Sequence, residues 1–392
     1  MVRPQIPKAQ ALQKFWRLTE RYVCGVVFLR KISVVFTGGG SAGHVTPNLA
    51  LIPILKTKFS NLDLHYIGSE DGIEKEILAK HPEITYHSVR TGKLRRYFSW
   101  KNFSDPFRVM AGYHDAKKLI KELRPAVVFS KGGFVSVPVA AAAHSCKVPV
   151  IAHESDLTPG LANKISARYA TKICTTFPDT VKDLPKGVGV YTGSPIRPEL
   201  FRGDAARARA RYAFDRKPVI LIMGGSLGSA ALNKAVRENV PVLIKTYNII
   251  HLCGKGNIEE KYKSYAPSYR QFEFISEELP DALALADFVI SRAGSNAIHE
   301  FLALHKPMLL IPLPLSASRG DQILNAESFE RRGYAIVLRE EKITPSTFLS
   351  AISYLEKDKQ KMIAAMESEQ NTNGAKAIAE IIAEQIRCSL KQ

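Results

Sequence analysis

Three glycines and a histidine follow the first apolar run of the chain. Gly38, Gly40 and Gly43 lie in FTGGGSAGHVTP with the G-x-G-x-x-G spacing that seats a dinucleotide pyrophosphate, and His44 comes next. A neutral imidazole accepts a proton near pH 7, so His44 is a candidate general base. Glycines with this spacing also occur wherever a parallel strand turns sharply into a helix. The motif alone therefore leaves a binding role and a purely structural role open.

Two features argue against a dinucleotide at this loop. An NAD site needs a carboxylate about 20 residues further on to hold the ribose, and Glu70 comes late for that role. The sequence also predicts His44 and Pro47 in the first helical turn, where a bulky imidazole would obstruct the close approach of a pyrophosphate. We therefore do not expect a dehydrogenase.

A second glycine loop, in MGGSLGSAALN, has the properties of an anion site. Gly224, Gly225, Ser226 and Gly228 leave backbone N–H groups free at a predicted helix start. The helix dipole adds about half a positive charge there. This combination suits a diphosphate, and no D-x-D pair lies near the loops. We therefore predict that the protein needs no metal and no cofactor.

A third loop, in SRAGSNAIHE, places Gly294 and Ser295 at the start of a predicted helix, with Glu300 inside that helix. An ionised carboxylate only accepts hydrogen bonds, so Glu300 can accept two from a ribose diol. On the local pattern alone, a solvent-facing side chain is an equally good interpretation of Glu300.

Alternating strands and helices must position these loops. The runs ISVVF, AVVFS, VILIM and DFVISR are each followed by glycine and a helical period, and residues 62–69 and 148–155 are further predicted strands. This order predicts an α/β protein with two Rossmann-like domains, one opened by the Gly38 loop and one by the Gly224 loop. Because ligands bind outside the carboxyl ends of parallel strands, the cleft between the domains is the predicted site.

Composition agrees with this organisation. A chain of 392 residues with 45% hydrophobic content suits two domains. The 55 basic and 37 acidic residues give a net charge of +18, which favours an anionic partner such as nucleic acid, anionic lipid or a phosphorylated substrate. Five widely spaced cysteines without a C-x-x-C pair predict neither a disulfide framework nor a zinc site. No apolar run reaches the roughly 18 residues of a membrane-spanning helix.

Seven ordered blocks resemble the MurG family, the N-acetylglucosaminyltransferases of bacterial peptidoglycan synthesis. The blocks are FTGGGSAGHVTPNLAL, SKGGFVSVPVAAAA, HESDLTPGLANK, GSPIR, MGGSLGSAALN, SRAGSNAIHEFLALHKPMLLIPLP and DQILNAESFERRGYA, spread over residues 31–385. The resemblance implies a GT-B fold, in which the two Rossmann-like domains face each other across a cleft. It also implies inverting transfer of GlcNAc from UDP-GlcNAc to the 4-hydroxyl of the MurNAc sugar of lipid I, which forms lipid II and UDP.

The resemblance gives each part of the chain a role. Residues 31–195 are expected to form the acceptor- and membrane-binding domain, residues 196–365 the UDP-GlcNAc-binding domain, and residues 366–392 a helix that packs back toward the first domain. Prolines and a glycine in GSPIRPELF mark the boundary. Residues 1–30 are expected to be an N-terminal extension of unknown role.

The resemblance also implies site residues for the donor. Ser41, Ala42 and Gly43 would border the donor sugar, Gln322 would touch it, and Ile275 would meet uracil through its backbone. The diphosphate and ribose would contact Arg197, Gly225, Ser226, Ser295, Asn296, Ala297, Ile298, His299 and Glu300.

Inverting transfer needs a base beside the acceptor hydroxyl, and His44 is the first candidate. Glu154 and Asp156 are the alternatives. Many relatives have H-E-Q-N where this chain has His153, Glu154, Ser155 and Asp156. Because Asp156 can accept but not donate, any hydrogen bond that this position donates in relatives is in doubt here.

The segment 90–108 alternates basic and aromatic residues, which suits an anionic membrane surface. Its candidate acceptor and membrane contacts are Lys93, Arg95, Arg96, Tyr97, Phe98 and Trp100. Stacking on nucleic acid is the rival interpretation, which the family resemblance disfavours. The expected partners are UDP-GlcNAc, lipid I, an anionic membrane and other cell-wall synthesis proteins. The expected location is peripheral, on the cytoplasmic face of the inner membrane.

Two alternative functions stay open from the sequence. One is another UDP-sugar enzyme of the same fold, such as a diacylglycerol glycosyltransferase or a UDP-GlcNAc 2-epimerase. The other is a non-catalytic module that binds a UDP-sugar or a membrane.

Overall fold

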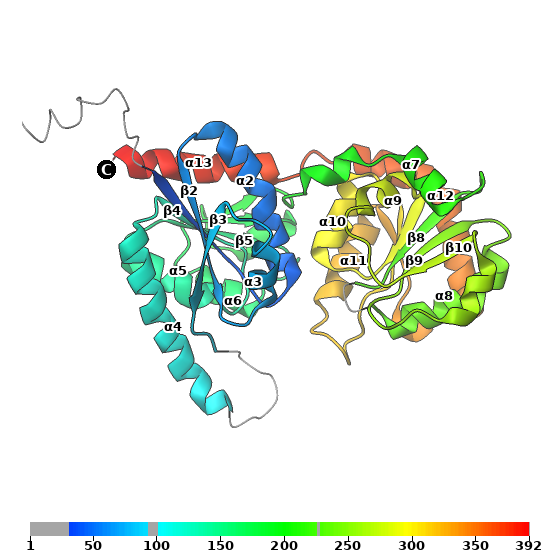
Figure 1. The fold of residues 1–392 in the computed structure, drawn as a ribbon, viewed down its shortest axis with the longest axis horizontal. Helices are drawn as coiled ribbons and strands as arrows, with labels where there is room; N and C mark the ends of the chain where they lie inside the picture. The colour runs from blue at the N-terminus through cyan, green and yellow to red at the C-terminus, as the bar shows by residue number, and fades with distance from the viewer. Residues whose placement is uncertain (1–30, 93–100, 226–227, 392) are drawn as a thin grey trace, which may run out of the picture.

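The computed structural model describes residues 31–92, 101–225 and 228–391, which form two α/β domains side by side (Figure 1). Each domain has one sheet in which all paired strands are parallel, and in each the strand order reverses beside the first strand. This is the doubly wound arrangement of Rossmann-like domains, so the predicted fold class is confirmed.

The first domain contains a seven-stranded sheet in the order β3-β2-β1-β4-β5-β6-β7. Its strands are β1 Ile32–Thr37, β2 Leu62–Ser69, β3 Ile84–Val89, β4 Val127–Ser130, β5 Val150–Glu154, β6 Lys172–Thr175 and β7 Gly189–Tyr191. Its helices are α2 Thr46–Lys58, α3 Ile73–Leu78, α4 Lys101–Leu123, α5 Ser136–Ser145, α6 Leu161–Ser166 and, from the end of the chain, α13 Ala375–Lys391.

Helices cover both faces of this sheet, which explains why its central strands are almost continuously apolar. In β1, Val34 and Phe36 pack in a cluster with residues of α2 and α13. Between them, Val35 faces the opposite side and packs with residues of α4 and α5. The alternation follows from the two-residue period of a strand.

The second domain contains a six-stranded sheet in the order β10-β9-β8-β11-β12-β13. Its strands are β8 Val219–Met223, β9 Asn248–Leu252, β10 Tyr269–Phe272, β11 Phe288–Ser291, β12 Met308–Leu310 and β13 Ala335–Val337. Its helices are α7 Ala205–Tyr212, α8 Ala230–Leu243, α9 Leu279–Leu285, α10 Ser295–Ala303, α11 Asp321–Arg331 and α12 Pro345–Glu367. Short 3-10 turns occur at Ala42–His44, Asp179–Asp183, Pro198–Arg202, Glu260–Tyr265 and Glu340–Lys342.

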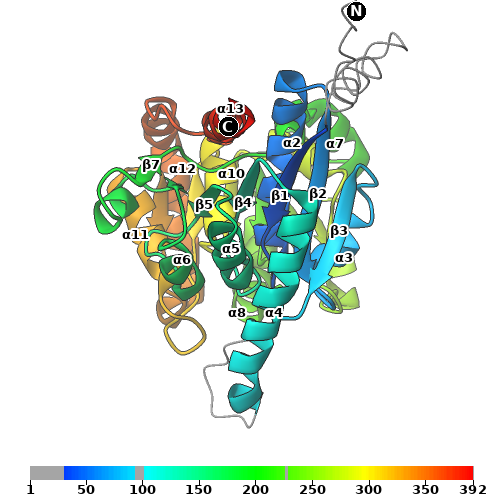
Figure 2. The ribbon, with the colours of Figure 1, turned by 90° about the vertical axis from the view of Figure 1, so that its left-hand side faces the viewer.

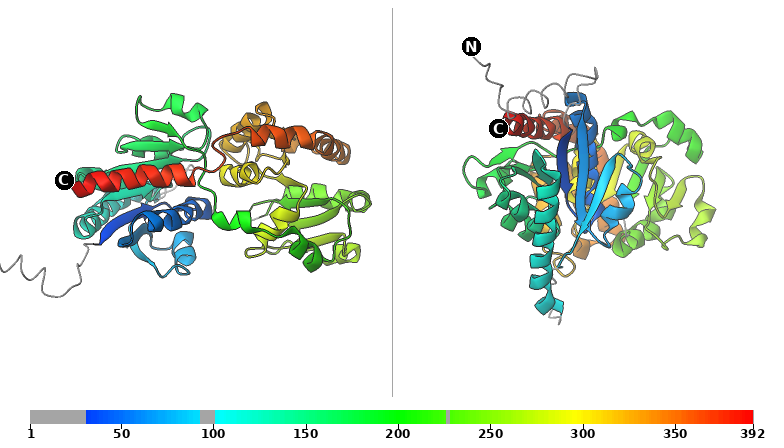
Figure 3. Two further views of the ribbon diagram at one scale, coloured as in Figure 1. Left: turned by 90° about the horizontal axis from the view of Figure 1, so that it is seen from above. Right: turned by 60° about the vertical axis from the view of Figure 1, so that its left-hand side comes forward.

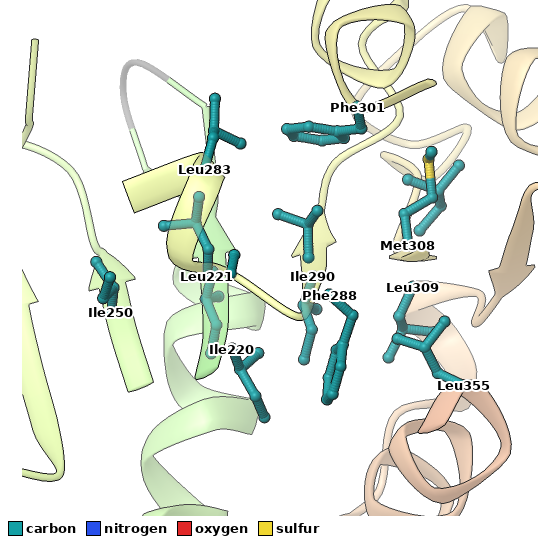
Figure 4. Packing of buried hydrophobic residues seen from close by; sticks show 14 of the residues in the cluster. Ile220, Leu221, Ile250, Leu283, Phe288, Ile290, Phe301, Met308, Leu309 and Leu355 are labelled. Atoms are coloured by element: carbon teal, nitrogen blue, oxygen red, sulfur yellow. The ribbon is translucent and has the colours of Figure 1, made fainter. Parts of the chain in front are cut away.

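One apolar core holds the second sheet to its helices (Figure 4). Ile220 and Leu221 of β8 lie beside Phe288 and Ile290 of β11, and Leu355 reaches them from α12. All five side chains are almost fully buried. This rigid core fixes the ends of β8 and β11, where the second and third glycine loops begin.

The C-terminal helix α13 returns to the first domain and lies along it (Figure 3, left). It contacts α2 and β4, and its residues Ile378, Ile382 and Ile386 are fully buried there. The spacing of four residues places them on one face of the helix. The chain therefore crosses between the domains twice, once before α7 and once before α13.

Among the described residues, none of the helices combines the length and apolarity needed to cross a bilayer.

Candidate active site

The glycine loops lie at the two places where the strand order reverses. In the first sheet, β1 and β4 are neighbours and are followed by Gly38 and by Lys131. In the second sheet, β8 and β11 are neighbours and are followed by Gly224 and by Arg292. Crevices for ligands form at such points because loops from neighbouring strands diverge there.

Hydrogen bonds between the domains show that these two edges face each other. Asn296 Nδ2 donates to the carbonyl oxygen of Gly43 over 2.9 Å. The Ser295 hydroxyl donates to the carbonyl oxygen of Ser155. Both donors belong to the first turn of α10, so the start of this helix lies against the loops that follow β1 and β5.

His44 ends a 3-10 turn and precedes α2, so it lies just outside the first helical turn in which the sequence placed it. Its Nδ1 is 2.7 Å from the carbonyl oxygen of Gly39. A carbonyl only accepts, so Nδ1 carries the hydrogen and the neutral ring has its lone pair on Nε2. Within the described residues, Nε2 has no protein hydrogen-bond partner. The His44 ring is thus oriented by its own loop.

Close packing around His44 requires glycine at position 133. Gly133 has a φ of +86°, and a Cβ atom there would lie 2.3 Å from the Gly39 carbonyl oxygen and 2.9 Å from His44 Nδ1. The loop after β4 therefore packs directly against the loop after β1. Burial in this packing lowers the pKa of His44, and the charge of Lys131 lowers it further. The imidazole is held neutral and can accept a proton.

Glu154, an alternative base, is buried, and three neighbouring donors bind its carboxylate. Its carboxylate accepts hydrogen bonds from the backbone N–H of Asp156 (2.9 Å), from the backbone N–H of Gly160 (3.1 Å) and from Asn163 Nδ2 (2.8 Å). Burial and the charge of Asp156 raise the pKa of Glu154 to about 7. Through its bonds to the backbone of Asp156 and Gly160, Glu154 holds the 155–160 loop in place.

Asp156, the other alternative base, contacts the second domain. Its Oδ1 accepts a hydrogen bond of 2.9 Å from Asn325 Nδ2 of α11. Asn325 Oδ1 in turn accepts from the backbone N–H of Leu157 over 3.0 Å. Asn325 therefore supplies the donor that the acidic side chain needs, and the Asp in place of Asn is accommodated by this contact. Burial raises the pKa of Asp156.

Arg197 and Glu300 form an ion pair beside the start of α10. Arg197 directly precedes the 3-10 turn Pro198–Arg202, and its Nη2 is 3.0 Å from Glu300 Oε1. Both side chains are partly exposed, at 27% and 16%. Burial raises the pKa of Glu300 and the guanidinium of Arg197 lowers it, so the cation favours the ionised carboxylate. The pair offers a cation for a phosphate and an acceptor for a diol.

Two other predicted residues of α10 belong to the core of the second domain. Ile298 and His299 are buried, and the His299 ring packs edge-to-face on Phe177 at 4.8 Å. Any ligand contact from these two residues must therefore come from their backbone. Gly294, at the start of α10, has extended backbone and no side-chain cap, so no capping side chain occupies the first N–H groups of this helix.

The structure describes three of the remaining predicted donor residues, Gln322, Ile275 and Gly225. Gln322 lies on α11, and its Oε1 accepts from the backbone N–H of Leu313 over 3.1 Å. Ile275 is 6% exposed and lines a cavity of about 270 Å³ with Phe272 and Phe274. Gly225 has a φ of +90° with open space around it, whereas Ser226 falls outside the described residues.

The predicted membrane contacts Lys93, Arg95, Arg96, Tyr97, Phe98 and Trp100 all lie outside the described residues. The helix that follows them, α4, projects with its N-terminal end beyond the rest of the first domain (Figure 2). On this helix Phe107 and Met110 are exposed, at 78% and 59%.

Sequence reasoning missed two residues of this region, Lys131 and Asn325. Lys131 lies in SKGGFVSVPVAAAA, directly after a strand that the sequence predicts to be buried. This position is the signal that could have indicated it. Asn325 lies in DQILNAESFERRGYA, and its partner is 169 positions away, so no local pattern indicates it. A cavity of about 380 Å³ beside Glu154, lined by Thr158, Asn163 and Lys164 among others, was also not predicted.

Comparisons with known proteins agree with this architecture. The model of the glycosyltransferase family 28 N-terminal domain matches residues 34–175, and that of the family 28 C-terminal domain matches residues 219–382. The chain is 54% identical over 358 residues to the UDP-N-acetylglucosamine–N-acetylmuramyl-(pentapeptide) pyrophosphoryl-undecaprenol N-acetylglucosamine transferase of Clostridium botulinum, covering 91% of this chain and 99% of the relative. It is 56% identical over 350 residues to an enzyme of the same name, numbered 2, from Bacillus anthracis, covering 89% and 97%.

Among solved structures, the crystal structure of MurG from Acinetobacter baumannii matches with a TM-score of 0.71 and 25% identity, covering 90% of this chain and 99% of that one. The chain belongs to glycosyltransferase family 28 and, within it, to the MurG family of N-acetylglucosamine transferases.

Proposed function

We propose that the chain transfers GlcNAc from UDP-GlcNAc to the 4-hydroxyl of MurNAc in lipid I, forming lipid II and UDP with inversion. The observation that carries this proposal is the position of His44. Its loop is bound to the start of α10 by the hydrogen bond from Asn296 to Gly43, and because its Nδ1 donates to Gly39, Nε2 is the nitrogen that can accept a proton. A base on one domain and an anion site on the other are what a two-substrate transfer requires.

In the proposed reaction, His44 Nε2 takes the proton of the acceptor hydroxyl. The hydroxyl oxygen then attacks C1 of the GlcNAc from the face opposite the UDP. The bond between C1 and the β-phosphate oxygen breaks, and the electron pair leaves with UDP. General base catalysis of this kind typically contributes about 10² to 10⁴ in rate.

The second domain stabilises the leaving UDP in this proposal. The uncapped N–H groups at the start of α10, the loop at Gly225 and the guanidinium of Arg197 all offer positive potential to a diphosphate. Glu300, ionised beside Arg197, accepts hydrogen bonds from the ribose diol. Removing one such preorganised donor typically costs about 3–4 kcal/mol of barrier. The described residues contain no group of three or more His, Cys, Asp or Glu side chains that could hold a metal.

We further propose that the first domain contacts an anionic membrane surface near the N-terminal end of α4. Exposed Phe107 and Met110 project there, next to Arg108. The apolar side chains would enter the headgroup region and the basic ones would pair with anionic lipids. Lipid I is itself a polyprenyl lipid, so this contact would bring the enzyme to its acceptor.

A two-substrate assay tests the proposed function. UDP release is measured with UDP-GlcNAc alone, with a short-chain lipid I analogue alone, and with both together. We expect UDP only when both are present, and a product one GlcNAc heavier than the acceptor. UDP release without acceptor would instead indicate a 2-epimerase. Release with diacylglycerol but not with the lipid I analogue would indicate a glycolipid synthase, and UDP-GlcNAc binding without any turnover would indicate a binding module.

A further inference from the structure

A lysine is buried at the point where the first sheet reverses its strand order. Lys131 follows β4 directly, and its side chain is 1% exposed. Burying an ammonium costs several kcal/mol unless hydrogen bonds and opposite charges compensate it. Because it is covered, Lys131 cannot touch either substrate, so any influence on the reaction must pass through its neighbours.

The Lys131 ammonium donates two hydrogen bonds, one to the end of β5 and one to the loop that follows it. One goes to His153 Nδ1 over 2.7 Å, and the other goes to the Ser155 hydroxyl. Since His153 Nδ1 accepts, its Nε2 carries the hydrogen, and that atom lies 3.4 Å from both the Gly193 carbonyl and the Thr176 hydroxyl. Lys131 therefore fixes the tautomer of a buried histidine and the start of the 155–160 loop.

Ser155 connects Lys131 to the second domain. Its hydroxyl accepts from Lys131, while its carbonyl accepts from the Ser295 hydroxyl at the start of α10. Two hydrogen bonds thus join a buried cation of the first domain to the proposed anion site of the second. A displacement of Ser155 would move the two reacting halves relative to each other.

Lys131 also acts electrostatically on the proposed base. The loop Lys131–Gly133 packs against His44, and the ammonium charge disfavours protonation of the imidazole. Around the two side chains lie titratable groups from every neighbouring element: Glu74 of α3, Tyr66 of β2, His153, Glu154 and Asp156 of β5 and its loop, Cys174 of β6 and His299 of α10. Besides Lys131, the members that can carry a positive charge are histidines, and burial keeps His153 and His299 neutral.

We propose that Lys131 is a positioning residue for the transfer reaction: it holds Ser155 against the start of α10 and places a cation beside His44. The proposal rests on the proposed function, because it assigns Lys131 to the same reaction. Burial is the main reason why the pKa of His44 is lowered, and the Lys131 charge adds to that effect when the ammonium is protonated. The hydrogen bond to Ser155 sets the distance between base and donor. Burial lowers the pKa of Lys131 itself to about 7, and Glu154 and Asp156 oppose that shift.

Two variants separate the charge from the hydrogen bond. Lys131→Gln removes the charge and keeps an N–H donor, whereas Ser155→Ala removes one acceptor and keeps the charge. The matched control is Lys306→Gln in the second domain, whose half-buried ammonium donates to the carbonyls of Ala284 and Ala286. Each variant is first checked for folding by circular dichroism and thermal unfolding. The pH dependence of kcat and kcat/KM is then measured with both substrates.

For Lys131→Gln we expect the acidic limb of the kcat/KM profile to move to higher pH, because His44 loses a neighbouring cation. The KM for UDP-GlcNAc should stay unchanged. For Ser155→Ala we expect kcat to fall about 10- to 100-fold with the limb in its wild-type position, since small misplacements of reacting groups have effects of that size. Lys306→Gln should lower thermal stability without moving the limb.

The proposal would be overturned if Lys131→Gln folds and the acidic limb of its kcat/KM profile stays at the wild-type pH. A Ser155→Ala protein with wild-type kcat would also overturn it. If Lys131→Gln does not fold, the Ser155→Ala result alone decides in the same way. Failure of the proposed function would appear separately, as an inactive wild-type protein. In that case the titration of His44 by NMR of ring-labelled histidine still tests the electrostatic contact, with an upward shift of its pKa expected in Lys131→Gln.

Discussion

Asn296, on the second domain, donates a hydrogen bond of 2.9 Å to the carbonyl oxygen of Gly43, on the first. Gly43 precedes His44, and Asn296 follows the first residue of α10. One hydrogen bond therefore joins the loop of the proposed base to the helix start that we propose binds the donor phosphates. The two halves of the reaction are placed by residues 253 positions apart in the chain.

Replacing His44 with Gln should abolish turnover without abolishing donor binding. Glutamine keeps a donor for the Gly39 carbonyl but has no basic nitrogen. We expect kcat to fall about 10²- to 10⁴-fold, while the affinity for UDP, measured by calorimetry, changes little. His114→Gln, an exposed position on α4, is the control and should keep wild-type kcat. Wild-type turnover in His44→Gln would show that another residue is the base.

Replacing Asn325 with Leu should weaken the contact between the domains. The change leaves the Leu157 N–H and the Asp156 carboxylate without their partner, and an unpaired buried polar group costs about 1–3 kcal/mol. We expect kcat/KM to fall about 10-fold or more, as measured by UDP release. Asn239→Leu is the matched control, because this buried asparagine donates to the carbonyl of Ala235 within its own helix, α8. It should lower the melting temperature while kcat persists; equal losses of kcat in both variants would argue against a specific contact.

Replacing Arg197 with Met should make UDP binding pH-dependent. Without the guanidinium, the already raised pKa of Glu300 rises further, so the carboxylate becomes protonated as the pH falls. A protonated Glu300 accepts fewer hydrogen bonds from the ribose, so we expect the affinity of the variant to fall more steeply on acidification than that of the wild type, with the loss beginning at a higher pH. Arg207→Met, which breaks an ion pair with Asp281 away from the cleft, should show the wild-type pH dependence.

Replacing His251 with Gln tests a stability effect of burial. His251 is fully buried between Tyr269 and Asn233, and burial lowers its pKa from 6.5 to about 3. Below pH 6.5 the unfolded chain binds a proton there that the folded protein excludes, so this contribution to stability is present above pH 6.5 and is lost as the pH falls toward 3. At pH 5 the loss amounts to about 2 kcal/mol. The stability difference between wild type and variant, measured by urea unfolding, should therefore shrink from pH 8 to pH 5; a constant difference would contradict the burial effect.

Much of the fold could be predicted from local sequence patterns. Residues 62–69 form β2 as predicted, and the predicted strand at 148–155 is the slightly shorter β5. Glycines follow β1, β4 and β8 because each strand turns sharply at the sheet edge. The sequence did not indicate the other seven strands, β3, β6, β7, β9, β10, β12 and β13. The shortest of them are held in the sheets by neighbouring strands rather than by their own composition.

The site was less predictable, because its contacts depend on how the domains meet. The sequence indicated His44 and Glu300, whose residue types and positions after glycine loops are informative. It did not indicate that three donors, from the 155–160 loop and from α6, occupy the Glu154 carboxylate, or that Lys131 is buried. Such facts depend on backbone placement within about an ångström, which no spacing rule encodes.

The most direct test of the account is a crystal structure of the protein with UDP-GlcNAc. We predict the ribose diol on Glu300, the diphosphate at the start of α10 near Gly294 and beside the loop at Gly225, and C1 of the sugar facing His44 Nε2. UDP bound in the turn at Gly38, with the second domain vacant, would contradict the account.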